Sequence, residues 1–113
     1  MDKLAALEAW GVNMTEVMER FLDDKGLYAD CLNTFVQETG FDALSKSLQE
    51  KNYEQAFNDV HTLKGVAGNL GLDPLFKSLS TMTEALRAKD YSNLEAQHKD
   101  VEEKFKEFKN IMA

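Results

Sequence analysis

Apolar residues recur every three to four positions along most of this chain, which is the spacing of one face of an α-helix. The pattern predicts four longer helices, over residues 27–50, 53–70, 74–88 and 92–112. The polar connections between them are short, and short connections make consecutive helices run antiparallel. Because no segment shows the alternation of a strand, we expect an all-α fold: an antiparallel up-down four-helix bundle over residues 27–112.

The longest of these helices, over residues 27–50, contains a glycine in its interior. Gly40 does not shift the phase of the apolar positions around it, among them Leu27, Cys31 and Phe35. We therefore expect one helix with a possible bend rather than two helices. Cys31 is the single cysteine and cannot form an internal disulfide, so we interpret it as a small buried hydrophobe.

Residues 1–26 precede the bundle and are expected to form a short N-terminal helical cap. A first short helix ends at Gly11, and Asn13 followed by Glu16 has the spacing of a capping box that begins a second helix. A chain of this length holds one core, so we expect a single domain over residues 1–113.

Turn chemistry marks the ends of the later helices. Gly71 suits the left-handed position that follows a helix. Asp73 is expected to cap the next helix, and Pro74 fits the first turn of that helix. Ser92 and Glu95 have the spacing of another capping box.

The helix predicted over residues 53–70 carries two glycines, Gly65 and Gly68, each of which costs about 1 kcal/mol relative to alanine in a helix interior. Neither glycine has a structural reason that is evident in the sequence. At about 100° per residue, both glycines project to within about 40° of His61. The apolar residues of this helix cluster on the opposite side: Ala56, Val60, Leu63, Val66, Ala67 and Leu70. We therefore expect His61 to point away from the core on a surface with few side chains, with Lys64 beside it.

Composition narrows the classes of partner. The net charge of −7 argues against non-specific binding to nucleic acids, which requires a basic surface. No apolar run approaches the roughly 18 residues of a membrane span, and the first residues do not resemble a secretory signal. We therefore expect a cytoplasmic protein that binds neither nucleic acids nor membranes.

Several chemistries do not fit His61. A metal site needs further ligands that converge on the histidine, but Glu54 projects two turns away and His98 lies on another predicted helix. No nucleophile pairs with His61 at a spacing typical of hydrolases, and the order of Lys64 and Gly65 does not match a phosphate-binding loop. We expect neither a metal site nor a hydrolytic centre.

A nucleophile that holds a phosphoryl group does fit. A histidine side chain ordinarily has a pKa of about 6.5, so a neutral ring nitrogen is available near neutral pH. Phosphoryl transfer requires in-line access for a donor and an acceptor, and positive charge close to the phosphoryl oxygens. Gly65 and Gly68 would leave room for a large partner, and Lys64 would supply the charge.

The segment His61-Thr62-Leu63-Lys64-Gly65-Val66-Ala67-Gly68-Asn69-Leu70-Gly71 closely resembles the signature of histidine phosphotransfer (HPt) domains of multistep two-component phosphorelays. The resemblance covers almost the whole chain, because this family is a four-helix bundle preceded by a short N-terminal helix. Residues 21–28, which lead into the first long helix, also look like the corresponding part of the family.

The resemblance implies that His61 accepts a phosphoryl group from an aspartate of one receiver domain and passes it to another. It implies that Lys64 stabilises the charge of the phosphoryl group, and that Gly65 and Gly68 keep the surface accessible. The receiver domain, of a response regulator or a hybrid sensor histidine kinase, brings Mg²⁺, so no cofactor is expected on this chain. No ATP-binding domain is evident, so we expect a phosphotransfer intermediate without kinase activity of its own.

Three further residues are candidates for contact with a partner. Phe57 projects to the histidine side of its helix, where an exposed aromatic residue suits the centre of an interface. Packing of Phe57 against the N-terminal cap or a neighbouring helix is an equally good interpretation. Asn58 and Asn69 lie on the flanks of the same surface.

A non-catalytic alternative stays open. The same bundle could dock a receiver domain or another protein without phosphotransfer, with His61 as a relic. A phosphohistidine assay separates the two hypotheses. In either case we expect a monomer, because no second exposed apolar stripe is evident.

Overall fold

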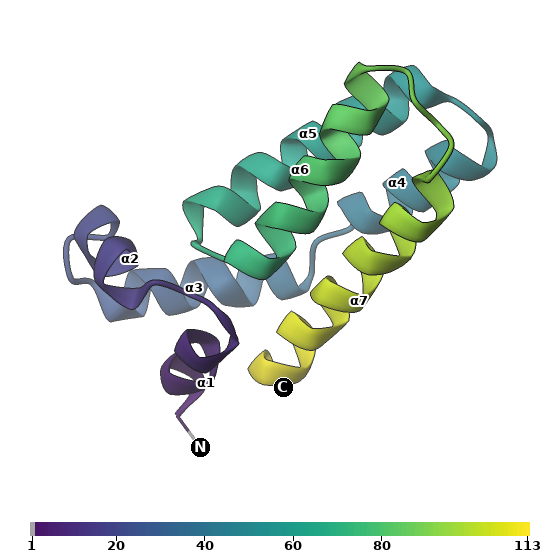
Figure 1. The fold of residues 1–113 in the computed structure, drawn as a ribbon. Coiled ribbons are helices and arrows are strands. Elements are labelled where there is room, and N and C mark those ends of the chain that lie inside the picture. Colours follow the sequence, from purple (N-terminus) through teal and green to yellow (C-terminus); the bar gives the residue numbers. More distant parts are fainter. Residues whose placement is uncertain (1) are drawn as a thin grey trace.

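A computed structural model describes residues 2–113 and shows them as a series of helices. They are α1 (Lys3–Trp10), α2 (Met14–Arg20), α3 (Lys25–Val36), α4 (Gly40–Gln49), α5 (Tyr53–Asn69), α6 (Asp73–Arg87) and α7 (Leu94–Met112) (Figure 1). These described residues include no strand, so the predicted all-α class is confirmed. Met1, the first residue of the predicted domain, lies outside them.

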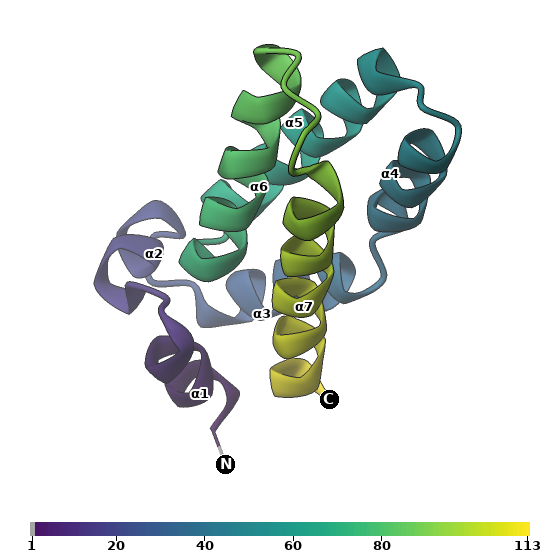
Figure 2. The same ribbon diagram turned by 45° about the vertical axis from the view of Figure 1, so that its right-hand side comes forward.

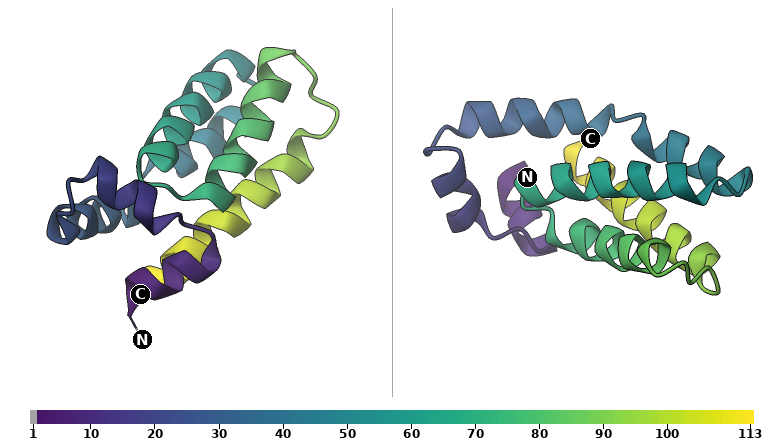
Figure 3. Two further views of the ribbon diagram at one scale, coloured as in Figure 1. Left: turned by 60° about the vertical axis from the view of Figure 1, so that its left-hand side comes forward. Right: turned by 90° about the horizontal axis from the view of Figure 1, so that it is seen from above.

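Helix α5 is the central element of the packing. It contacts α4 and α6, and α6 in turn packs against α7. Figures 1 and 2 show α5 and α6 side by side, and Figure 3 shows α3 and α4 following one another along one edge of the molecule. The molecule is elongated, with extents of 41 × 24 × 20 Å.

The two N-terminal helices are tied to the ends of longer ones. Helix α1 lies beside α7, where Lys3 Nζ donates a hydrogen bond to the carbonyl of Met112 at 2.8 Å. In α2, the Arg20 guanidinium donates to the carbonyl of Asn69 at 2.7 Å. Arg20 thus satisfies a carbonyl that the C-terminal turn of α5 leaves without a helical partner.

The helix predicted over residues 27–50 is two helices, α3 and α4, and the prediction of one helix is wrong. Residues 37–39 leave the helix, and the Glu38 carboxylate accepts a hydrogen bond from the backbone N–H of Gly40 at 2.8 Å. A Cβ atom at Gly40 would lie 2.9 Å from Cδ2 of Leu63, a buried side chain of α5. The break therefore brings the start of α4 against α5, and glycine permits this close approach.

The apolar stripe of α3 differs from the expected one at its start. Leu27 is 50% exposed, whereas its neighbour Tyr28 is fully buried. Cys31 is half-buried and packs against the edge of the core, so its interpretation as an apolar side chain holds but full burial does not, and Leu32 is the fully buried residue. The hydroxyl of Tyr28 donates to the carbonyl of Leu70 at 2.8 Å, which joins the start of α3 to the end of α5.

The helix ends predicted around α2 and α5 are confirmed. The side chain of Asn13 caps α2 by accepting a hydrogen bond from the backbone N–H of Glu16 at 3.2 Å. Gly11 ends α1, and Gly71 follows α5 with a φ of +72°. A left-handed residue at this position costs least when it is glycine.

The starts of the last two helices differ from the prediction. Asp73 is the first residue of α6 rather than its cap, and the cap position belongs to Leu72. The predicted capping box of Ser92 does not form, because α7 begins only at Leu94. The Ser92 hydroxyl instead donates to the Asp90 carboxylate at 2.6 Å, which closes the turn.

The core fixes how α5 is rotated. Its buried residues are Ala56, Val60, Leu63 and Ala67, all from the predicted apolar stripe. Aromatic rings of α3, α4 and α7 fill the neighbouring core: Phe35, Phe41, Phe105 and Phe108. Burying the stripe turns the opposite side of α5 toward solvent.

None of the described helices has the length and apolar content that crossing a bilayer requires.

Candidate functional site

His61 lies in the middle of α5, a helix of 17 residues, and its side chain is exposed. Its neighbour Val60 is fully buried and Leu63 is 2% exposed. Because these two residues anchor the backbone on either side, His61 is held on a rigid element while its ring remains accessible.

Gly65 leaves the surface next to His61 open. A Cβ atom built at this position would have no atom of residues 2–113 within 4 Å, apart from its own helical backbone and chain neighbours. The packing of the described chain therefore does not require glycine here. Alanine would favour the helix by about 1 kcal/mol, so the open surface is the remaining physical reason for glycine at this position.

Gly68 differs from Gly65, because it has a packing partner. A Cβ atom at Gly68 would lie 3.0 Å from Cε1 of Phe76, whose ring comes from α6. The expectation that both glycines lack a structural reason is therefore wrong for Gly68. Its small size lets the Phe76 ring lie close to the backbone of α5.

Lys64 is half-buried and contacts the same ring. Its Nζ atom lies over Phe76, 5.9 Å from the ring centroid, a distance compatible with a cation–π interaction. In the described chain no carboxylate lies within ion-pair distance of this ammonium group. Lys64 is thus held near His61 while its charge is left without an acidic partner.

Phe57 is half-buried and stacks against His61. The two ring centroids are 5.7 Å apart and the ring planes differ by 14°. The guanidinium of Arg87, from α6, lies over the Phe57 ring at 5.5 Å, and the carboxylate of Glu84 contacts Arg87 at 2.8 Å. The prediction that Phe57 lies on the histidine side of α5 is confirmed.

The two asparagines proposed as flanking residues are exposed. The backbone carbonyl of Asn58 accepts a hydrogen bond from the Thr62 hydroxyl at 3.0 Å, within α5. The backbone carbonyl of Asn69 accepts from Arg20, as described above. Both contacts use the backbone, and the side chains of Asn58 and Asn69 lie on the surface near either end of the site.

Sequence reasoning missed Phe76, Arg87 and Glu84, all from α6. No pattern within the segment around His61 indicates them, because they lie between 15 and 26 residues further along the chain. The antiparallel packing of α5 and α6 brings them beside the site, with Phe76 near its C-terminal end and Arg87 near its N-terminal end.

The second histidine is packed differently. His98 is half-buried between α4 and α7, where Nε2 lies 3.1 Å from the Ser45 hydroxyl and Nδ1 lies 3.4 Å from the Glu102 carboxylate. Both of its ring nitrogens therefore have a neighbour within the chain. Nothing in residues 2–113 brings three or more His, Cys, Asp or Glu side chains together as a metal site.

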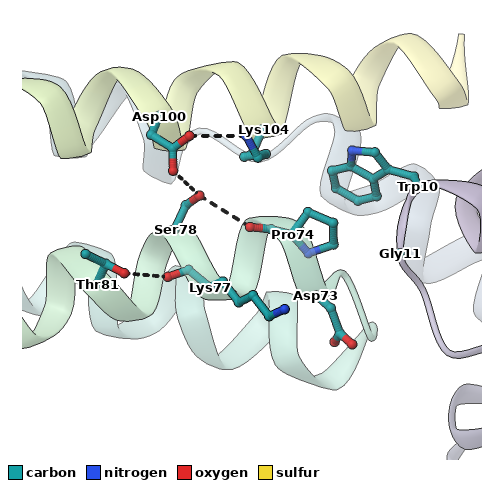
Figure 4. A pocket seen from close by; sticks show the side chains of 9 residues that line it. All are labelled: Trp10, Gly11, Asp73, Pro74, Lys77, Ser78, Thr81, Asp100 and Lys104. Carbon is teal, nitrogen blue, oxygen red and sulfur yellow. Dashed lines mark hydrogen bonds and ion pairs between the residues drawn. The ribbon is translucent and has the colours of Figure 1, made fainter.

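A cavity of about 490 Å³ lies between α1, α6 and α7, and none of the candidate site residues around His61 lines it (Figure 4). In it the Ser78 hydroxyl donates to Asp100, and Lys104 contacts the same carboxylate at 3.2 Å. The hydrogen bond from Ser78 lowers the pKa of Asp100, and the hydrogen bond to Asp100 raises the pKa of Lys104. These groups satisfy one another and connect α6 to α7.

Comparison with known protein families identifies the class of the chain. The model of the Hpt domain family matches residues 29–113, which include α4 to α7 and most of α3. The chain therefore belongs to the Hpt domain family, whose members are histidine phosphotransfer carriers of phosphorelays. No curated protein and no solved structure matches the chain.

Proposed function

We propose that this chain is a phosphoryl carrier in which His61 accepts a phosphoryl group from a receiver-domain aspartate and passes it to a second receiver aspartate. The observation that carries the proposal is the exposed ring of His61 on a rigid helix, beside the open surface at Gly65. A partner the size of a receiver domain can approach such a ring without displacing any side chain at position 65.

The transfer step uses one ring nitrogen of neutral His61. Its lone pair attacks the phosphorus of the aspartyl phosphate, an N–P bond forms, and the P–O bond to the aspartate breaks with its electron pair leaving on the carboxylate. The second step is the reverse, with the carboxylate of another receiver as the nucleophile. Both steps need in-line access along the direction of the nitrogen lone pair.

Lys64 is the residue we expect to stabilise the transferred group. Its ammonium group carries no acidic partner in the described chain, so it is available to the phosphoryl oxygens. A mobile point charge of this kind suits a group that is held only transiently. Gly65 serves access, Gly68 combines access with the packing of Phe76, and Asn58 and Asn69 are the proposed flanking contacts to the receiver.

The remaining expectations follow from the same proposal. The receiver contributes Mg²⁺, and the chain has no cofactor and no ATP-dependent kinase activity of its own. The receiver belongs to a response regulator or a hybrid sensor histidine kinase in the cytoplasm, and the carrier acts as a monomer and a single domain. We propose that α3 and α4 together occupy one of the four positions of the bundle, so that the working unit is an up-down four-helix bundle of α3–α4, α5, α6 and α7.

Phosphoryl transfer from a labelled receiver tests the proposal. When the purified chain is mixed with phosphorylated receiver domains of its own organism, we expect acid-labile label on the wild-type protein and none on the His61→Gln variant. The matched control is Lys99→Gln, which changes an exposed residue of α7 and should accept label like the wild type. Label retained by His61→Gln would refute the assignment, and folded wild-type protein that accepts no label from any receiver would favour the non-catalytic docking module.

A further inference from the structure

We propose that Phe57 is a positioning residue that fixes the ring plane of His61, and that Arg87 holds Phe57 in place from the neighbouring helix. The inference rests on the proposed function of His61, and it assigns Phe57 a role within the chain in addition to any contact with a partner. It begins from a continuous contact path from Glu84 through Arg87 and Phe57 to His61.

The stack between Phe57 and His61 follows from helix geometry. The two residues are four positions apart on α5, so their side chains lie on the same side of the helix. A centroid distance of 5.7 Å with nearly parallel planes, 14° apart, lies within the range of offset-stacked aromatic pairs. The phenyl ring therefore restricts rotation of the imidazole about its side-chain bonds.

Arg87 provides the anchor that a helical pair alone lacks. Its guanidinium lies 5.5 Å from the centroid of Phe57, and Glu84, one turn earlier on α6, fixes the guanidinium through a contact of 2.8 Å. Because α5 and α6 pack along their length, this contact ties the orientation of the Phe57 ring to a second helix.

The orientation of the imidazole plane matters because the lone pair of its unprotonated nitrogen lies in that plane. Fixing the plane fixes the direction from which the ring can attack phosphorus, and in-line transfer depends on that direction. A neighbour that covers only a ring face leaves the nitrogens at the ring edge free. The same stack is compatible with the phosphorylated ring, because the phosphoryl group extends from the edge.

Positioning and docking make different predictions for Phe57. If the ring only contacted the receiver, its removal would raise the receiver concentration needed for half-maximal transfer and leave the maximal transfer rate unchanged. If it orients His61, its removal lowers the maximal rate and changes the imidazole in the free protein, where no receiver is present. The two roles are therefore separable in one variant.

The test uses Phe57→Leu, which keeps apolar volume and removes the ring, and Phe57→Tyr, which restores a ring. In the free protein, ¹³C relaxation of the His61 ring should show larger motion in Phe57→Leu than in the wild type, and wild-type behaviour in Phe57→Tyr. With a receiver that phosphorylates the wild type, the maximal transfer rate of Phe57→Leu should fall by about threefold to tenfold, the rate equivalent of losing one aromatic pair.

The control is Tyr53→Leu, one turn earlier on α5, which removes a ring that stacks on Tyr91 at 3.9 Å instead of on His61. It should leave the motion of the His61 ring and the maximal rate unchanged, and circular dichroism should show that both variants are folded. Arg87→Gln changes an exposed residue and, like Phe57→Leu, should increase the motion of the His61 ring and lower the maximal transfer rate. Lys77→Gln on the same helix should change neither.

Unchanged motion of the His61 ring in folded Phe57→Leu would overturn the proposal, as would a loss confined to receiver affinity. The relaxation measurement needs no phosphoryl group. Failure of the proposed carrier function, seen as a wild-type protein that takes up no label, is therefore distinguishable from failure of this inference.

Discussion

At the scale of single residues, the site depends on which side chains are missing as much as on which are present. His61, Lys64 and Gly65 were predictable from the sequence because they lie on one helix and their relative positions follow from 3.6 residues per turn. Gly65 and Gly68 look alike in that projection. They differ only because Phe76 of α6 covers one of them.

This difference predicts that the same substitution changes the free energy of unfolding by different amounts at positions 65 and 68. Gly65→Ala should raise the free energy of unfolding by about 0.5–1 kcal/mol, because alanine favours the helix and the new methyl group meets no neighbour. Gly68→Ala should stabilise the protein by about 1 kcal/mol less than Gly65→Ala does, because its methyl group would lie only 3.0 Å from the Phe76 ring. Urea unfolding of both variants measures the difference, and equal stabilisation would contradict the packing role of Gly68.

At the residue scale, the contacts of Phe57 could not be predicted from the sequence of α5 alone. Its position on the histidine side was predictable from the angle, but its stack on His61 and its contact with Arg87 require knowledge of side-chain orientation and of the neighbouring helix. A helical projection contains neither. The residues missed at the site all share this cause.

At the scale of elements, the break between α3 and α4 places the start of α4 against α5. Periodicity could not reveal it, because the apolar phase continues across Gly40 and only the contact with Leu63 explains why the glycine is needed. Prediction of element types was accurate, whereas prediction of the break and of the caps at α6 and α7 was not. Caps depend on individual hydrogen bonds, and a single competing contact such as that of Ser92 with Asp90 displaces them.

Gly40→Ala should therefore destabilise the protein by about 1–3 kcal/mol. Its methyl group would lie 2.9 Å from Cδ2 of Leu63, which is 2% exposed and has little room to move. The control is Gly26→Ala in α3, where the nearest atom, Oδ1 of Asp24, would be at an ordinary 3.4 Å. A thermal melt in which Gly40→Ala is as stable as Gly26→Ala would show that the close approach at the break is not required.

The hydrogen bond from Tyr28 to Leu70 predicts how the junction of α3 and α5 responds to alkaline pH. Burial raises the pKa of Tyr28 to about 12, above its ordinary value of about 10. The folded state therefore favours the protonated phenol, so this contribution to stability is complete below about pH 10 and is lost as the pH rises toward about 12.

Tyr28→Phe should lower the free energy of unfolding at neutral pH by about 1–3 kcal/mol, because the carbonyl of Leu70 loses its donor in a buried place. Between pH 9 and pH 12 the variant should lose less stability than the wild type, which urea unfolding at each pH measures. Parallel losses in the two proteins would show that Tyr28 ionises no later in the folded state than in the unfolded one.

At the scale of the whole molecule, the packing of the helices leaves one side of α5, the side that carries His61, exposed to solvent. The all-α class and membership of the Hpt family agree with the periodicity and with the segment around His61. Burial of the opposite stripe orients α5, Arg20 and Tyr28 hold its C-terminal end, and α6 supplies the side chains that flank the histidine. The chain presents the imidazole of His61 and the ammonium group of Lys64 on this side, and we expect the receiver to supply the remaining groups of the reaction.

The most direct test of the central claim is to locate the phosphoryl group after passage between two receivers. The chain is incubated with a phosphorylated receiver, separated from it at neutral pH and divided, one half for tandem mass spectrometry and the other for mixing with a second, unphosphorylated receiver. We predict a phosphoryl group on His61 in the first half and its appearance on the second receiver in the other. A phosphoryl group found on any residue other than His61, or one that no second receiver removes, would contradict the account.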